Sequence, residues 1–263
     1  MDNSFLPQTV TYIQNETDPN KGMVVVTPCA PGYGATLGNS LRRVLLSSLS
    51  GIAIDAIKIK GAKHEFSTIP HVKEDLLEIV LNLKALRLKS LMDFSEPLEL
   101  DLKVSGEKVV KAKDISERPE IEIVNPDLVI AHLTDPKADF QMKIWIVKGY
   151  GWAPANEKSR EGREEGIIII DSIFNQVSRV GIDSENVRVG KNNNYEKITL
   201  NIETSGAVSP IEAFDRAVKI LFSEYNFLSQ EGDRLLGKTA ADDQKGSKEK
   251  TEAPKKKTKK SKK

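Results

Sequence analysis

Three acidic side chains, Glu74, Asp75 and Glu78, lie close enough in the sequence to do chemistry together. Clustered carboxylates can bind a divalent metal ion, so a carboxylate-dependent metal enzyme is one hypothesis. The first turn of a helix also favours acids, because its free N–H groups carry partial positive charge. The three histidines of the chain are scattered, and no two have the spacing of zinc ligands. We therefore expect these acids to begin a helix, and we expect no metal site and no cofactor in this chain.

A glycine-rich segment, Gly32–Gly34, precedes a helical pattern, as a phosphate-binding loop would. It lacks the lysine and the spacing of a P-loop and the third glycine of the dinucleotide fingerprint, which favours a tight strand-to-helix turn. No serine lies in a G-x-S-x-G motif. The single cysteine, Cys29, cannot form an internal disulfide. We expect no catalytic residues in this chain.

The elements that position these residues follow from the spacing of apolar residues. A helix is predicted from about Thr36, and a second over residues 71–84. From Gly51 to residue 66 the pattern alternates, which predicts a pair of strands. Strands are also predicted around residues 9–14, 23–28, 86–90, 98–104, 107–112, 121–125, 128–133, 140–148, 166–174, 186–190 and 195–205, with a polar loop over 148–166. Many short strands with few helices indicate the α+β class.

The last predicted helix has a well-marked start. Ser209 can cap it, Pro210 suits its first position, and Glu212 completes the capping pattern. Its apolar residues follow a 3-4-3-4-3 spacing over about 27 Å of helix. These are Ile211, Phe214, Val218, Leu221, Tyr225 and Leu228. This face could pack on its own domain, or form a coiled-coil-like seam with another helix, for which a homodimer is the natural use.

Charge is distributed unevenly along the chain. Residues 238–263 contain 11 lysines and 4 acids. Subtracting these from the 39 basic and 38 acidic residues of the whole chain leaves 28 and 34 in residues 1–237, a net charge of −6. The tail lacks aromatic residues and is expected to be disordered. A stand-alone nucleic-acid-binding protein that uses this tail is a second hypothesis, which the acidic body argues against.

The sequence has no apolar run long enough to span a membrane, and no signal pattern at its start. We expect a cytoplasmic protein without a membrane partner.

A further question is raised by two adjacent arginines, Arg42 and Arg43, in the middle of the first predicted helix. Successive residues on a helix point about 100° apart, so one partner surface cannot easily bind both. Either one arginine is solvated, or this helix has more than one neighbour.

Several long segments together resemble one family. The segments are PGYGATLGNSLRRVLLSSLSG, HEFSTIPHVKEDLLEIVLNLK, KGYGWAP, IDSIFNQV and ENVRVGKNNNYEKITLNIETSGAVSPIEA. They resemble, in order and over about residues 8–230, the alpha subunit of bacterial-type multisubunit DNA-directed RNA polymerase. KGYGWAP departs somewhat from the usual RGYVP of that family.

The resemblance implies a non-catalytic assembly subunit of a nucleotidyltransferase that homodimerises and recruits the beta and beta-prime subunits. It implies a discontinuous dimerisation subdomain with two long helices on a sheet, residues 1–50 and 167–231, and an inserted strand-rich subdomain, residues 51–166. The basic tail is assigned to residues 232–263. As part of the polymerase, the protein would be associated with the nucleoid.

The resemblance also implies site residues. Dimerisation is assigned to Leu37, Leu41, Val44, Leu45, Ile211, Phe214, Val218, Leu221, Tyr225 and Leu228. Beta-subunit binding is assigned to Arg43, Leu46, His71, Val72, Lys73, Glu74 and Asp75. Beta-prime binding is assigned to Asn186, Arg188 and Lys197. The second arginine of the family's L-R-R motif, here Arg43, is the one tied to beta.

One departure from the family is expected at the C-terminus. Family members usually continue into a small helical domain that binds upstream promoter DNA and activators, whereas no apolar periodicity follows Leu236. We therefore expect DNA to be contacted only indirectly, or non-specifically by the lysine-rich tail.

Overall fold

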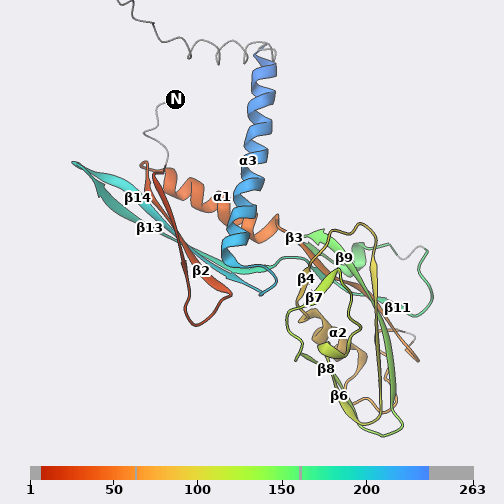
Figure 1. Ribbon diagram of the computed structural model, residues 1–263. Coiled ribbons are helices and arrows are strands. Elements are labelled where there is room, and N and C mark those ends of the chain that lie inside the picture. Colours follow the sequence, from red (N-terminus) through yellow and green to blue (C-terminus); the bar gives the residue numbers. More distant parts are fainter. Residues whose placement is uncertain (1–6, 63, 160–161, 237–263) are drawn as a thin grey trace, which may run out of the picture. The chain divides into compact units, whose positions relative to one another are not determined.

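The computed structural model of the chain describes residues 7–62, 64–159 and 162–236 (Figure 1). Of the tail assigned to residues 232–263, residues 237–263 lie outside the described residues, whereas residues 232–235 are helical and not disordered as expected. The chain forms two compact units, residues 1–220 and residues from 221 onward, and each is described by itself. The first unit is built from strands with two helices and the start of a third, which confirms the predicted α+β class.

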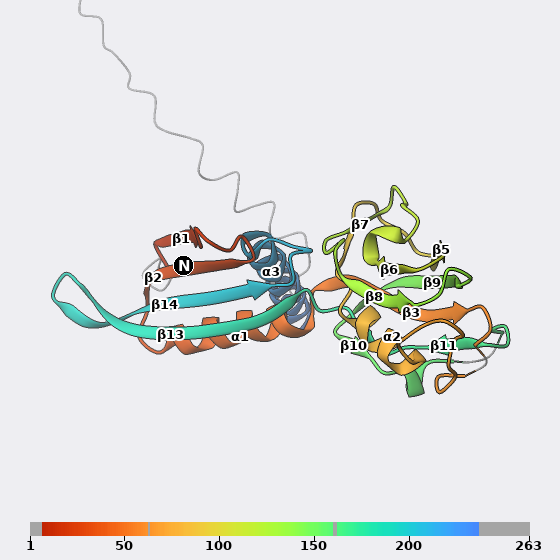
Figure 2. The same cartoon turned by 90° about the horizontal axis from the view of Figure 1, so that it is seen from below.

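One antiparallel sheet of the first unit combines strands from distant parts of the sequence. In order across the sheet, its strands are β1 (Thr9–Gln14), β2 (Lys21–Cys29), β14 (Asn192–Thr204) and β13 (Val177–Val189). Alternate residues of the two central strands are buried, and Leu200 lies opposite Val24 in the register. Helix α1 (Tyr33–Ser47) lies along β13 and β14 (Figure 2). Gly38 permits this close packing, because a Cβ there would lie 3.1 Å from Ile182 Cγ2.

A second sheet has the order β11 (Ile167–Ile169), β3 (Ser50–Ile59), β9 (Asp139–Tyr150) and β5 (Leu98–Ser105). Three two-stranded sheets accompany it: β4 (Leu88–Ser90) with β7 (Ile121–Ile123), β6 (Lys108–Lys111) with β8 (Val129–Leu133), and β10 (Trp152–Ala153) with β12 (Ser172–Ile173). Two short 3-10 turns, Ala112–Asp114 and Ala155–Glu157, complete this part.

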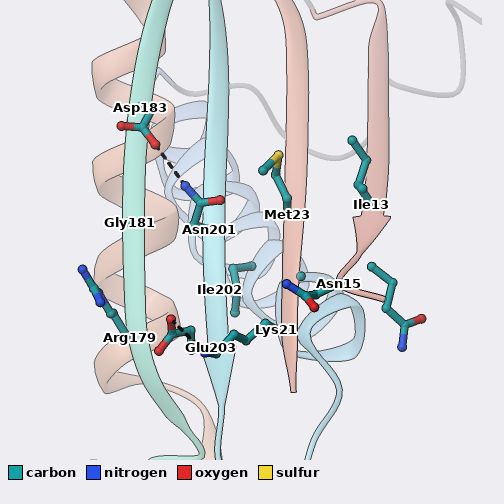
Figure 3. Close-up of a pocket in the computed structure, with 12 residues that line it drawn as sticks. Ile13, Asn15, Lys21, Met23, Arg179, Gly181, Asp183, Asn201, Ile202 and Glu203 are labelled. Atoms are coloured by element: carbon teal, nitrogen blue, oxygen red, sulfur yellow. Dashed lines mark hydrogen bonds and ion pairs between the residues drawn. The ribbon is translucent and has the colours of Figure 1, made fainter. Parts of the chain in front are cut away.

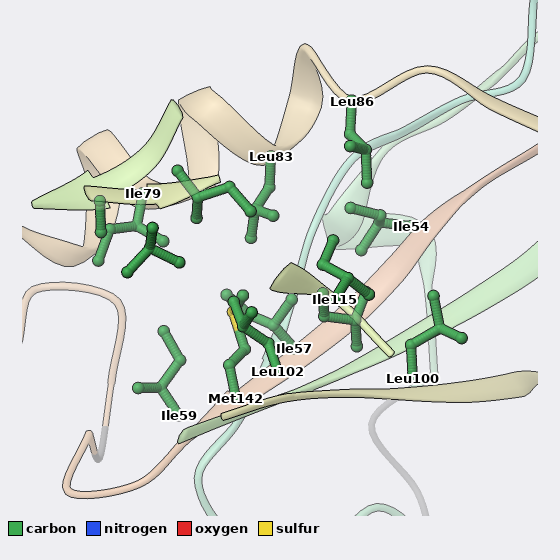
Figure 4. Packing of buried hydrophobic residues seen from close by; sticks show 14 of the residues in the cluster. Ile54, Ile57, Ile59, Ile79, Leu83, Leu86, Leu100, Leu102, Ile115 and Met142 are labelled. Carbon is green, nitrogen blue, oxygen red and sulfur yellow. The ribbon is translucent and has the colours of Figure 1, made fainter. Parts of the chain in front are cut away.

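A hydrophobic core of the first unit lies between this second sheet and helix α2 (Leu76–Lys84). Leu76, Ile79 and Leu83 of the helix are buried on β-branched and leucine side chains of β3, β5 and β9 (Figure 4). The helix begins at Asp75, whose carboxylate accepts a hydrogen bond from the Glu78 N–H at 2.8 Å. The predicted helix start at the three acids is thus confirmed, but the helix predicted over residues 71–84 is wrong in its first five residues, which lie outside α2.

The predicted pair of strands between Gly51 and residue 66 is wrong. A single strand, β3, ends at Ile59, and the chain then turns at Gly61, which has a φ of 88°. Nearly all of β3 is buried, because β11 and β9 flank it and the core covers it. The apolar residues there reflect burial in the middle of a sheet, and among the described residues that follow no second strand forms.

Helix α3 (Pro210–Leu235) begins where the capping pattern predicts. The Glu212 N–H donates to Ser209 Oγ at 3.3 Å. Its turns carry i,i+4 ion pairs, such as Lys219 Nζ to Asp215 Oδ2 at 2.6 Å. The helix extends four residues past residue 231, where the dimerisation subdomain was predicted to end.

Candidate interaction site

The glycine-rich turn before α1 is occupied by a carboxylate of the chain itself. Glu196 on β14 accepts hydrogen bonds from the N–H groups of Gly32, at 3.0 Å, and Gly34, at 2.8 Å. A phosphate would need these same amides, so the interpretation as a strand-to-helix turn is the one that the geometry supports. This carboxylate at the N-terminus also explains why α1 begins at Tyr33, three residues before the predicted start. No local signal could have identified Glu196, which is more than 160 residues away.

The two arginines of α1 both point away from the protomer core. Arg42 and Arg43 are exposed, and neither guanidinium forms an ion pair with a carboxylate of the described residues. Leu46, one turn after Arg43, is half-buried. The opposite face of α1 is buried against its own sheet through Leu41, Val44 and Leu45, with Leu37 half-buried beside them. Burial within one chain accounts for these apolar residues without a partner, and their role in dimerisation stays a prediction.

The segment His71–Asp75 is attached to strand β8. The Lys73 N–H donates to the His132 carbonyl at 3.0 Å, and the Thr134 N–H donates to the His71 carbonyl at 2.9 Å. Val72 forms a bridge with Leu133. His71 has a φ of 63°, which is unusual for a residue other than glycine. The side chains of His71 and Lys73 are exposed, whereas Val72 is half-buried.

The two acids of this segment have partners within the chain. The buried carboxylate of Glu74 accepts hydrogen bonds from the His132 N–H, at 2.7 Å, and the His132 ring. Burial alone would raise the pKa of Glu74, but these hydrogen bonds outweigh it and leave the pKa lowered. Asp75 caps α2, so the acids do not converge on a common point. Among the described residues, no group of three or more metal-ligating side chains could hold a metal ion.

The three residues assigned to beta-prime lie together near the turn of the β13–β14 hairpin. Lys197 Nζ is 3.2 Å from Glu185 Oε2 on the opposite strand. Asn186 lies opposite Glu196 in the register, and Arg188 Nε donates to the Gly190 carbonyl at 3.0 Å. Because Glu196 also binds the start of α1, this hairpin end lies at the N-terminus of α1, and Arg43 is in the later part of that helix. The structure therefore places the three beta-prime residues together at the hairpin end and Arg43 toward the other end of α1, whereas His71–Asp75 is attached to β8.

A hollow on the sheet face opposite α1 offers no catalytic arrangement (Figure 3). Two pairs of its polar side chains contact each other, one of them through the hydrogen bond from Asn201 Nδ2 to Asp183 Oδ2 at 3.0 Å. Lys21 Nζ lies 3.9 Å from Glu203 Oε1. The lining contains no serine, cysteine or histidine that a general base could activate.

Exposed apolar side chains follow the predicted seam of α3. Val218 is 41% exposed, Tyr225 57% and Leu228 62%, and Ile211 is also exposed. Phe214 and Leu221 are half-buried. The neighbouring alanines, Ala213 and Ala217, belong to the first unit and are buried. A row of exposed large apolar side chains along one helix is a surface that protein–protein contacts favour.

Two further large apolar side chains of α3 are exposed. Phe222 is 70% exposed and lies beside the seam. Phe227 is 61% exposed, but helical spacing turns it away from Tyr225 and Leu228.

No helix within the described residues is long and apolar enough to cross a membrane.

These surfaces and the α+β fold are those of a chain that can bind other proteins, and similarity to known proteins identifies its family. Residues 57–175 match the family model described as the RNA polymerase Rpb3/RpoA insert domain. The chain is 43% identical over 222 residues to the DNA-directed RNA polymerase subunit alpha of Carboxydothermus hydrogenoformans, a match that covers 84% of this chain and 70% of the relative.

Two other relatives bear the same name. The protein from Oceanobacillus iheyensis is 45% identical over 219 residues, which cover 83% of this chain and 68% of that relative. The protein from Aquifex aeolicus is 44% identical over 227 residues, with 86% and 70% covered. The chain therefore belongs to the family of alpha subunits of DNA-directed RNA polymerase, and the resemblance drawn from its sequence is confirmed.

Proposed function

We propose that this chain is the non-catalytic assembly subunit of its polymerase, and that it homodimerises and then recruits one beta and one beta-prime subunit. RNA synthesis would be carried out by those two larger chains. The discontinuous sheet of β1, β2, β14 and β13 would belong to the dimerisation subdomain, and the part from β3 to β11 would be the inserted subdomain. The exposed apolar seam of α3 is the observation that carries this proposal.

The physical reason for dimerisation is the cost of leaving this seam in water. Each large apolar side chain gains about 1.5–3 kcal/mol when it is fully buried, so several together favour a partner surface. A two-fold axis would bring the same row of residues from both protomers together. The a and d positions of the heptad pattern are occupied by large apolar side chains, as such a contact requires.

The two sets of residues would then bind different partners. Arg43 and Leu46 on the exposed face of α1, with the segment His71–Asp75, would bind beta. Asn186, Arg188 and Lys197 on the β13–β14 hairpin would bind beta-prime. Support comes from the exposure of Arg43 and from the separation of the two sets along α1. The question raised by the adjacent arginines is answered if Arg43 binds beta and Arg42 remains solvated.

The test is a charge placed in the seam. The double variant Tyr225→Glu with Leu228→Glu is expected to be monomeric in sedimentation, because dimerisation would bury unpaired charges. Asn226→Glu with Gln230→Glu, at the outward b and f positions of the same turns, is the matched control and should remain a dimer. An unchanged dimer in the seam variant would refute the interface. Beta and beta-prime that co-purify with the wild-type chain would support recruitment, and a lone active species would contradict it.

A further inference from the structure

Three large exposed side chains lie at the junction of β9, β10 and β12, outside the surfaces described above. Tyr150 is 66% exposed, Trp152 62% and Ile173 51%, and we call these three residues the aromatic patch. Trp152 lies directly opposite Ile173 in the β10–β12 pair. Directly opposed residues of an antiparallel pair project on the same face and are neighbours, so these two side chains form one surface. None of these three side chains is part of the hydrophobic core.

The aromatic patch rests on a rigid base. The Phe174 N–H donates to the Gly151 carbonyl at 2.9 Å, and the Phe174 side chain is buried. A Cβ on Gly149 would lie 2.7 Å from the Phe174 ring, so the strand packs directly on that ring. Ser172 Oγ donates to the Ile54 carbonyl at 2.7 Å. Side chains held on such a base lose little backbone freedom when they bind a partner.

The aromatic patch begins where the exposed face of α1 ends. Tyr150 is paired with Ser50 in the β3–β9 register, just after α1. A Cβ on Gly151 would lie 3.5 Å from the Ser47 carbonyl oxygen. Ser47 is one turn after Arg43, and its hydroxyl donates to the Arg43 carbonyl at 2.7 Å. Residues four apart share a helix face, so the row from Arg43 through Ser47 leads directly to the patch.

We propose that the aromatic patch is the second half of the surface with which this chain binds the beta subunit. This inference rests on the proposed function, which assigns Arg43 to beta. The site on beta would be an apolar pocket for Trp152 and Ile173 with an acidic rim for Arg43. Trp, Tyr and Arg are the residues that most often dominate binding energy at the centre of an interface, and this surface contains all three.

The test is the titration of purified beta against the assembled dimer of each variant. Trp152→Ala is expected to weaken beta capture about thirtyfold, the usual effect of truncating a central aromatic residue. Trp152→Phe should recover part of that loss, and Ile173→Ala should give a smaller loss. Met92→Ala removes a side chain of comparable exposure, 57%, from another part of the second sheet region and is the matched control, expected to bind as wild type. Because Trp152 is mostly exposed, the thermal midpoint of each variant should stay near that of the wild type.

The outcomes separate this inference from the proposed function. Wild-type chain that fails to bind beta at all would overturn the proposed function. If wild type binds and Arg43→Ala is impaired, but Trp152→Ala binds as tightly as wild type, only the aromatic patch is refuted. A Trp152→Ala chain that becomes monomeric would assign the patch to a second copy of this chain. A selective loss of beta-prime would assign it to that subunit, and either result overturns the inference.

Discussion

The carboxylate of Glu196 is predicted to stabilise the first sheet and α1 through two charge-assisted hydrogen bonds. Glu196→Gln retains the shape of the side chain but leaves one acceptor oxygen where there were two. The N–H groups of Gly32 and Gly34, now 3.0 and 2.8 Å from the carboxylate, cannot both be satisfied by it. A hydrogen bond to a charged group contributes about 1.5–3 kcal/mol, and water can replace part of it at this half-buried site. We expect a loss of about 1.5 kcal/mol in the free energy of unfolding.

The assay is urea unfolding at one fixed protein concentration, because the stability of a dimer depends on concentration. Glu203→Gln is the matched control on the same strand. Its carboxylate lies 3.9 Å from Lys21 Nζ, and both side chains are partly exposed, so its loss should cost less than about 0.5 kcal/mol. An equal midpoint shift for the two variants, with unchanged slopes, would refute the role of Glu196.

A second variant examines the same contact from the helix. Gly to Ala in a helix ordinarily stabilises by about 0.5–1 kcal/mol. A Cβ on Gly34 would lie 2.2 Å from Glu196 Oε2, so Gly34→Ala is expected to destabilise instead. Combining it with Glu196→Ala should relieve much of that penalty, which a double-mutant cycle measures. Additive losses would contradict a direct contact.

Three further predictions concern the binding of beta, the buried carboxylate of Glu74 and the tail. Arg43→Ala should leave the dimer intact and weaken capture of beta by about thirtyfold. Arg42→Ala is the control and should have a smaller effect. Equal beta binding by wild type and Arg43→Ala in titration would refute the assignment. Glu74→Gln should destabilise the fold at neutral pH, because it removes the charged acceptor of the His132 N–H. The pKa of Glu74 is lowered by folding, so the stabilisation is present above the ordinary value of 4.5 and is lost as the pH falls through the folded value. The difference in the free energy of unfolding between wild type and variant should therefore shrink between pH 7 and pH 3. A constant difference in urea unfolding would contradict the mechanism. Deleting residues 238–263 should leave assembly unchanged and flatten the salt dependence of DNA binding by the holoenzyme equally on two unrelated sequences. The reason is that each neutralised phosphate contributes about −0.9 to the slope of log affinity against log salt concentration. A loss of affinity on one sequence alone would exclude a non-specific polycation.

The sequence by itself determined the features that depend on neighbouring residues. The start of α3 at Ser209 and the start of α2 at Asp75 follow from side chains that bond N–H groups three residues away. Most of the strands follow from the alternation or continuity of apolar residues. The heptad spacing of α3 likewise predicted which of its side chains form one row. The motifs alone also identified the family, because long segments in a fixed order carry that information without any structure.

The tertiary structure decided which distant groups meet. Glu196 binds the start of α1, and Glu74 binds His132, although 58 residues separate that second pair. Before folding, Glu74 is one acid among three near a helix start, and nothing local indicates that His132 will be its partner. The same holds for Gly151, whose approach to Ser47 joins the aromatic patch to α1. Local spacing determines the conformation of a segment, whereas the partner of a side chain depends on the path of the whole chain, because hydrogen bonds and packing act only over a few ångströms.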